Sequence, residues 1–295
     1  MMRAAVIFCF SGTGNTRWVS ERLREHLTTE DYRVNLLDIE DVITQDENAI
    51  MEAIRTADHV GIAFPVHAFN APRIVFDFID IMPDSSPEPK YVFLYRTSGD
   101  PFINGGSTRF VRDRLREKGY IVRLERLFIM PSNIIVPFPA PLIKQLYRIA
   151  EGQCRDFASQ VLGEDDSIHH DPEHIALFSR IFSKLETWGA KVAGGHFRAT
   201  ESCTYCGICS DGCPTSNITD DGGVLVFHDR CILCMRCIYQ CPSGSLVNPY
   251  LKFFALKEGY DNDPILSDAS IPGEYLTSAT RGYYKRYARF LGLIR

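Results

Sequence analysis

The strongest constraint on this chain is a cysteine pattern that occurs twice within residues 203–241. The two segments read CTYCGICSDGCP and CILCMRCIYQCP, and both have the spacing C-x2-C-x2-C-x3-C followed by proline. Eight of the ten cysteines lie here, which in a reducing compartment argues for metal binding. Three thiolates at two-residue gaps let a short loop surround three corners of a metal cluster. We expect the fourth cysteine to begin a helix that leads away.

This run resembles the bacterial ferredoxins that carry two [4Fe–4S] clusters, and the resemblance covers about 50 residues. It implies a small ferredoxin-like α+β domain in which the fourth cysteine of each run serves the other cluster. The implied ligands are Cys203, Cys206, Cys209 and Cys241 for the first cluster, and Cys231, Cys234, Cys237 and Cys213 for the second. Pro214 and Pro242 would end any helix or strand there and turn the chain.

A structural zinc site and a set of stabilising disulfide bonds are the alternatives for these cysteines. Zinc sites usually take four ligands as two separated pairs, which does not match two runs of four. Between the runs, TSNITDDGGVLVFHDR predicts a hairpin that turns at Gly222-Gly223. The two remaining cysteines, Cys9 and Cys154, are expected to be small buried hydrophobic residues.

Strand-like and helix-like runs alternate over the first 165 residues. The patterns predict strands at 3–10, 32–39, 58–64, 90–97 and 120–130, and helices at 15–27, 46–56, 71–82, 106–118 and 142–162. Such alternation predicts an α/β fold with right-handed crossovers and a parallel sheet covered on both faces. Five strands suit the flavodoxin-like order 2-1-3-4-5.

A glycine turn, SGTGNT, follows the first predicted strand and precedes the first helix. Backbone N–H groups and a helix N-terminus meet at such a turn and form an anion site. A dinucleotide fingerprint would need glycine where Arg17 stands, and a P-loop would need Gly-Lys-Ser/Thr. A monophosphate site fed by neutral donors fits better. Its candidate residues are Ser11, Gly12, Thr13, Gly14, Asn15 and Thr16.

At this turn the sequence resembles flavodoxins, whose phosphate loop has the same Ser/Thr-Gly-Asn-Thr character and binds FMN. The resemblance implies that the flavin ring lies beside the loops that follow the third and fourth strands, 64–72 and 97–106. Candidates in the first loop are Pro65, Val66, His67, Phe69 and Asn70; those in the second are Thr97, Ser98, Gly99 and Gly106. Residues 130–133 are a further candidate wall.

Flavodoxins often stack Trp or Tyr on the flavin ring, whereas these loops offer Phe69, Phe102 and His67. His67 could tune or protonate the flavin, although a single loop histidine is more often an ordinary surface residue. No nucleophile or base pair stands out, so the chemistry is expected to belong to the cofactors.

Four segments are expected along the chain. They are a flavin-binding domain (1–165), a linker with an amphipathic helix at 172–194 (166–199), a ferredoxin-like domain (200–247) and a C-terminal extension (248–295). The final run, 281–295, places Tyr283, Tyr287, Phe290 and Ile294 near one helical face with basic residues around it. It could bind a membrane surface or an acidic redox partner, but packing on its own protein is the simpler interpretation.

Acidic residues outnumber basic ones by 37 to 32, which argues against a nucleic-acid partner. No apolar run approaches the ~20 residues that a transmembrane helix needs, and the N-terminal run is too short for a signal peptide. We therefore expect a cytoplasmic protein.

The two ends of the sequence together predict an electron relay between two [4Fe–4S] clusters and one FMN. The chain resembles the fused flavodoxin/4Fe–4S proteins of anaerobic bacteria and archaea, and the relay would exchange electrons with an external redox donor or acceptor, either a protein or a small molecule. Two alternatives stay open. The chain could be a flavoenzyme that reduces an organic substrate above the flavin, with the 97–106 and 131–141 loops as its pocket. It could also be a non-catalytic subunit or redox sensor of a larger complex.

Overall fold

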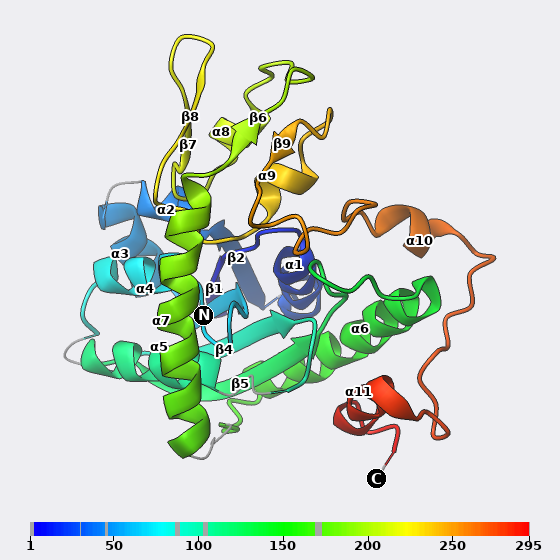
Figure 1. The fold of residues 1–295 in the computed structure, drawn as a ribbon. Coiled ribbons are helices and arrows are strands. Elements are labelled where there is room, and N and C mark those ends of the chain that lie inside the picture. Colours follow the sequence, from blue (N-terminus) through cyan, green and yellow to red (C-terminus); the bar gives the residue numbers. More distant parts are fainter. Residues whose placement is uncertain are drawn as a thin grey trace.

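Five parallel strands form the central sheet (Figure 1). A computed structural model describes residues 3–29, 31–44, 47–85, 89–102, 106–168 and 173–294. The strands are β1 (Arg3–Cys9), β2 (Tyr32–Asp38), β3 (His59–Pro65), β4 (Tyr91–Ser98) and β5 (Ile121–Ile129). Their order is β2-β1-β3-β4-β5, which confirms the predicted sheet.

Helices cover both faces of this sheet, as the unbroken apolar runs of the central strands require. Successive residues of β1 point to opposite faces, so Phe8 packs with one hydrophobic cluster and Ile7 with the other. The first cluster includes side chains of α3 (Glu47–Thr56), α4 (Arg73–Ile81) and α5 (Gly106–Glu117); the second includes those of α1 (Asn15–Leu27) and α6 (Ala140–Leu162). A short helix that was not predicted, α2 (Ile39–Ile43), follows β2.

Cys9 and Cys154 are both fully buried in the second cluster, as predicted. Burial raises the pKa of each thiol to about 12, so both stay protonated at neutral pH. They serve as core residues.

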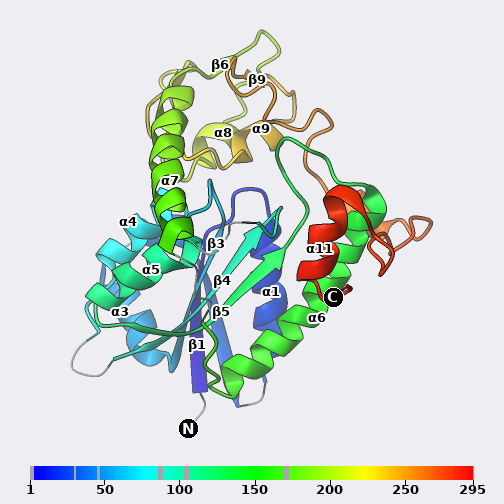
Figure 2. The same cartoon turned by 60° about the horizontal axis from the view of Figure 1, so that its bottom comes forward.

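The cysteine-rich region lies beyond the carboxyl ends of the strands (Figure 2). Its strands are β6 (Arg198–Ala199), β7 (Ile218–Asp220), β8 (Leu225–Phe227) and β9 (Leu246–Val247), paired antiparallel as β6-β9 and β7-β8. The predicted hairpin is confirmed, and Gly222 and Gly223 turn it with φ angles of 62° and 88°. Two single-turn helices, α8 (Ile208–Asp211) and α9 (Arg236–Tyr239), contain the third cysteine of each run. The expectation that the fourth cysteine begins a helix was wrong, because it follows the helix.

Helix α7 (Glu173–Gly194) connects the sheet to the cysteine-rich region. Its side chains contact the loop after β3, where Asn70 Nδ2 donates to Ser183 Oγ (2.9 Å). Part of the predicted linker extends the sheet, because Glu125 N–H donates to the Ser167 carbonyl and Ser167 N–H donates to the Arg123 carbonyl. The predicted helix-starting Pro172 lies outside the described residues.

The C-terminal segment wraps back along α6 (Figure 2). It forms α10 (Asp263–Ser267), a 3-10 turn (Gly282–Tyr284) and α11 (Lys285–Phe290). Tyr287 and Ala288 are fully buried against α6 residues such as Leu142, which confirms that this run packs on its own protein. Phe290, placed on the buried face by the sequence pattern, is 43% exposed. Within the described ranges, no helix combines the length and apolarity that crossing a bilayer demands.

Candidate functional site

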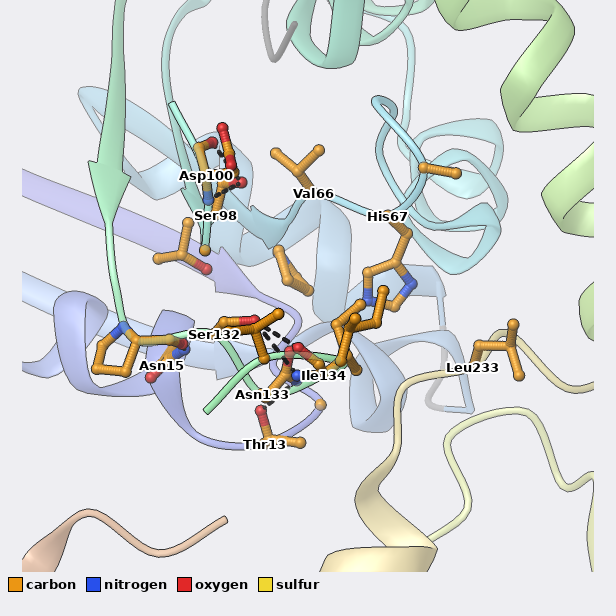
Figure 3. Close-up of a pocket in the computed structure, with 18 of the residues that line it drawn as sticks. Thr13, Asn15, Val66, His67, Ser98, Asp100, Ser132, Asn133, Ile134 and Leu233 are labelled. Atoms are coloured by element: carbon orange, nitrogen blue, oxygen red, sulfur yellow. Dashed lines mark hydrogen bonds between the residues drawn. The ribbon is translucent and has the colours of Figure 1, made fainter. Parts of the chain in front are cut away.

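A cavity of about 680 Å³ lies at the carboxyl edge of the sheet, within the size range of cofactor sites. Figure 3 shows its walls converging from several segments: Thr13 and Asn15 from the glycine turn, Val66 and His67 after β3, Ser98 at the end of β4 with Asp100 after it, Ser132–Ile134 after β5, and Leu233 from the second cysteine run. The sheet, the cysteine-rich region and the C-terminal segment therefore share one cavity.

Most of the predicted flavin-site residues line this cavity. They are Ser11, Gly12, Thr13, Asn15, Thr16, Pro65, Val66, His67, Phe69, Thr97, Ser98 and Gly99. Gly14 and Asn70 are not among its described lining residues: Gly14 directly precedes the first residue of α1, and Asn70 is buried against α7. Gly106 is the first residue of α5. Residues 103–105 of the predicted second loop lie outside the described residues.

The glycine turn has the features of an anion site. Gly14 adopts a left-handed conformation (φ 102°) directly before α1, and no acidic residue occurs in the first turn of that helix. The hydroxyl oxygen of Ser11 accepts a hydrogen bond from Arg17 N–H (3.2 Å), which leaves the hydroxyl proton free to be donated. The hydroxyls of Thr16 and Thr97 are hydrogen-bonded to each other (2.7 Å). A helix N-terminus with neutral donors is a favourable place for a phosphate.

The amide of Asn15 also connects two other segments. Its Nδ2 donates to the carbonyl of Pro131 (2.9 Å), and its Oδ1 accepts from the hydroxyl of Tyr260 (2.8 Å). Asn133 Nδ2 likewise donates to Thr13 Oγ1 (2.8 Å). These side chains tie the glycine turn to the loop after β5 and to the C-terminal segment.

Four non-glycine residues in the cavity walls adopt positive φ. They are Ala68 (41°), Phe69 (69°), Ile135 (63°) and Leu233 (52°). Such conformations are uncommon for residues with a side chain, and they gather at functional sites because the surrounding structure must hold them.

His67 bonds to the second cysteine run. Because a carbonyl only accepts, its Nδ1 must carry the proton that is donated to the carbonyl of Ile232 (3.0 Å). Burial lowers the pKa of His67 to about 4, although this hydrogen bond opposes the shift. The ring is therefore neutral at pH 7, with Nδ1 as the protonated nitrogen.

Ile134, Val136 and Phe138 line the cavity from the 131–141 loop, which was expected to form part of a pocket in the enzyme alternative. Other lining residues were not predicted: they come from α7 (Phe182, Glu186) and the C-terminal segment (Phe254, Tyr283, Tyr287). Tyr287 donates to the carbonyl of Gly99 (2.9 Å), which places α11 against the loop after β4. Burial raises the pKa of Glu186 to about 7. These residues reach the cavity only through tertiary contacts, and no local pattern marks them.

The eight cysteines gather as two sets of four. One small cavity is lined by Cys203, Cys206, Cys209 and Cys241, and a second by Cys213, Cys231, Cys234 and Cys237. In the described part of the chain, no three His, Cys, Asp or Glu side chains converge on a point where a single ion could bind. A [4Fe–4S] cluster holds its four thiolates apart around a larger body.

Both cysteine runs have the same backbone. Tyr205 and Leu233, at equivalent positions, have φ of 53° and 52°, and Gly207 and Met235 are also left-handed. The fourth cysteine accepts a backbone N–H four residues later in each run, from Asn217 to Cys213 Sγ (3.1 Å) and from Ser245 to Cys241 Sγ (3.3 Å). Such hydrogen bonds help set the potential of a cluster.

The second run touches the glycine turn. A Cβ at Gly12 would lie 2.5 Å from the carbonyl oxygen of Cys234, so only glycine permits this approach. Arg236 donates to the carbonyl of Ser11 (2.7 Å) and forms an ion pair with Glu40 (2.6 Å). The second set of cysteines and the large cavity are thus in direct contact.

The thiols of the second run differ in pKa. Burial raises the pKa of Cys231 to about 12 and that of Cys234 to about 11. Burial also acts to raise the pKa of Cys241, but hydrogen bonds from Ser245 and Ser243 outweigh it and lower the value to about 7. Metal binding must remove the protons of the buried thiols.

Residues 196–245 match the family described as the 4Fe-4S dicluster domain. This part of the chain therefore holds two [4Fe–4S] clusters, as predicted. Among curated proteins, none matches the sequence.

Several solved structures resemble the N-terminal half. A flavodoxin from the domain Archaea has 18% identity and a TM-score of 0.38, covering 54% of this chain and 99% of its own. An NADH:FMN oxidoreductase in its apo form has 16% identity and a TM-score of 0.42, covering 58% and 92%. An NAD(P)H:quinone oxidoreductase from Methanothermobacter marburgensis has 16% identity and a TM-score of 0.42, covering 57% and 99%. With its sheet order and its cysteine-rich region, the chain is a flavodoxin-like α/β domain fused to a 4Fe–4S dicluster domain.

Proposed function

We propose that this protein relays single electrons between its two [4Fe–4S] clusters and an FMN bound in the large cavity. It would exchange those electrons with an external donor or acceptor. One observation carries the proposal: Leu233 and Cys234 of the second cysteine run line the same cavity as the glycine turn. A flavin held there would lie against a cluster ligand.

The cavity suits FMN. The N-terminus of α1 and the hydroxyls of Ser11 and Thr13 would hold the phosphate, and the loops with Val66, His67 and Ser98 would hold the ring. The switch-point rule for open α/β sheets puts a ligand at this edge. The two sets of cysteines would hold the clusters with crossed ligation.

When bound, the clusters would carry one electron at a time and FMN would accept one or two. The protein's residues hold and orient them. His67 is neutral and fixes the loop after β3 to the second run, while Arg236 fixes the glycine turn to the same run. Oxygen-sensitive clusters and free thiols would suit a reducing, cytoplasmic compartment.

A photochemically reduced bacterial ferredoxin tests the relay. Mixed anaerobically with the reconstituted protein, it should bleach the flavin absorbance. Cys203→Ala and Cys231→Ala, each removing one proposed ligand, should slow this bleaching. The proposal is wrong if both variants lose iron and still reduce the flavin at the wild-type rate.

A second candidate function has its own support. The cavity wall beyond the flavin loops is apolar and aromatic. Its residues Phe138, Phe254 and Tyr287 come from segments outside the five-stranded sheet and the helices that cover it. Such a wall could hold a planar organic substrate above the flavin. Steady turnover of a quinone probe that is lost in Phe254→Ala, with bleaching by ferredoxin unchanged, would favour an enzyme. Equal turnover in wild type and variant would favour a carrier.

A further inference from the structure

The two cysteine runs face different surroundings although their backbones match. The second run is covered by the flavin-site loops, and Ile232 is 8% exposed within the core of the sheet domain. The equivalent Thr204 is exposed, as are Tyr205 (56%) and Ile208 (42%) beside it. Among the described residues, none from the first run lines the large cavity or joins the core of the sheet domain.

We propose that the first set of cysteines forms the outer end of the relay, where an external one-electron redox protein with a basic face docks, and that the second set forms the flavin end. The proposal rests on the proposed function. Electrons would pass from the partner to the first set of cysteines, then to the second set and then to the flavin cavity. This order follows from the contact between the second run and the glycine turn.

Charge identifies the kind of partner. Residues 199–229 contain neither lysine nor arginine. Exposed acids lie around the first set: Glu201, Asp211, Asp220 and Asp221. Asp211 lies close to Gly207, and Asp220 pairs with Leu225, which lines the first cavity. Exposed Tyr205 and Ile208 supply an apolar centre within this acidic rim, and opposite charge on a partner speeds its docking.

The electrons balance over two encounters. Each encounter oxidises the partner by one electron and reduces this chain by one electron. Two encounters supply the pair of electrons that full reduction of FMN consumes together with two protons. The transfer is reversible, so an oxidised basic acceptor should dock on the same face.

Matched ligand variants test the order without measuring turnover. Cys209→Ala and Cys237→Ala alter the third cysteine of each run, and each should remove about four irons per chain. A cluster beside the flavin quenches FMN fluorescence, and this quenching falls steeply with distance. Cys237→Ala should therefore lengthen the fluorescence lifetime of bound FMN much more than Cys209→Ala. Equal effects, or the reverse, would overturn the order.

Surface variants test the docking face and do not disturb the ligands. Protein that has been reduced in advance is mixed with cytochrome c, a basic one-electron acceptor, in a stopped-flow experiment at low salt. Asp211→Asn/Asp220→Asn/Asp221→Asn should slow the reduction of cytochrome c roughly tenfold, and high salt should remove the difference. The matched control, Glu52→Gln/Glu117→Gln/Asp156→Asn, removes three exposed acids from other helices and should leave the rate near wild type.

Each outcome bears on one proposal. If both triple variants slow the reaction equally, the docking face is wrong. If the wild type is a dimer that the first triple variant dissociates, the face binds a second copy of the chain and the proposal is also overturned. Wild-type protein that binds no FMN would refute the proposed function itself, whereas protein with all cofactors but the wrong lifetimes would refute only the order.

Discussion

The two cysteine runs compare one motif in two environments. Both have the same spacing, the same left-handed positions and the same N–H···S bonds, so each can wrap a cluster in the same way. The residues between the cysteines differ. Position for position, Ile232 replaces Thr204, Leu233 replaces Tyr205, and Arg236 replaces Ile208. The cysteines specify the metal site, and the residues between them decide what the site touches.

The contact made by the second run is extensive for so short a loop. Ile232 joins the core beneath the sheet, Leu233 lines the large cavity, and Arg236 reaches both Glu40 and the glycine turn. Among the described residues, the first run places no side chain in the core beneath the sheet and none in the wall of the large cavity. Matched substitutions at equivalent positions should therefore differ in effect.

The largest difference is expected between Arg236→Ala and Ile208→Ala. Arg236 and Glu40 are only 15% and 18% exposed, and burial already raises the pKa of Glu40. Removing Arg236 leaves a buried carboxylate without its cation, which costs about 3 kcal/mol of unfolding free energy. Ile208→Ala should cost less than about 1 kcal/mol because this side chain is largely exposed. Urea unfolding followed by circular dichroism measures the free energy of unfolding of both variants. Equal losses would show that the two runs do not differ in how they pack on the sheet domain.

A slightly smaller effect is expected at Ile232. Ile232→Ala leaves a space in the core beneath the sheet and should cost about 2–3 kcal/mol. Thr204→Ala, the matched change in the exposed run, should stay within about 0.5 kcal/mol of wild type. The same unfolding measurement checks this pair. An unchanged midpoint for Ile232→Ala would mean that the second run does not pack on the sheet domain.

Gly12→Ala should destabilise the protein by about 1–2 kcal/mol, because the new methyl group would overlap the backbone of Cys234. Gly152→Ala is the control. Nothing lies within 4 Å of its Cβ position on α6, so alanine there should stabilise by about 0.5–1 kcal/mol. The two substitutions should shift the thermal midpoint in opposite directions, and a stabilising Gly12→Ala would contradict the close contact.

The smallest effect concerns pH. The pKa of His67 is lowered from 6.5 to about 4, so the unfolded chain binds the proton more tightly than the folded protein. Stability from this residue is present above pH 6.5 and is lost as pH falls toward 4. His67→Gln keeps a donor without titrating, so lowering pH from 7.5 to 5.5 should cost the variant roughly 1 kcal/mol less than wild type. Equal losses in urea titrations would show that His67 is not buried against the second run.

Much of the fold could be predicted because its signals are local. The alternation of apolar runs and amphipathic helices predicts a covered parallel sheet, and the glycine turn falls between β1 and α1, as expected. The doubled motif predicts two sets of cysteines. In the structure, four cysteines line one small cavity and the other four line a second. Even so, the sequence misplaced the short helices within the runs, because two-residue gaps do not show which cysteine a single helical turn contains.

The rest depends on contacts between distant segments. Nothing near Asn15 indicates that its amide binds Pro131 and Tyr260, and nothing near Arg236 indicates a partner as far away as Glu40. Periodicity in 281–295 predicted a buried helical face but not which neighbour would cover it. Packing on α6 buries Tyr287 and leaves Phe290 in solvent.

A cofactor count tests the central claim most directly. Protein purified without oxygen is assayed for iron, acid-labile sulfide, zinc and flavin per chain. We expect about eight irons, a similar amount of sulfide and about one FMN per chain. Zinc in place of iron, or eight irons with no flavin, would contradict it.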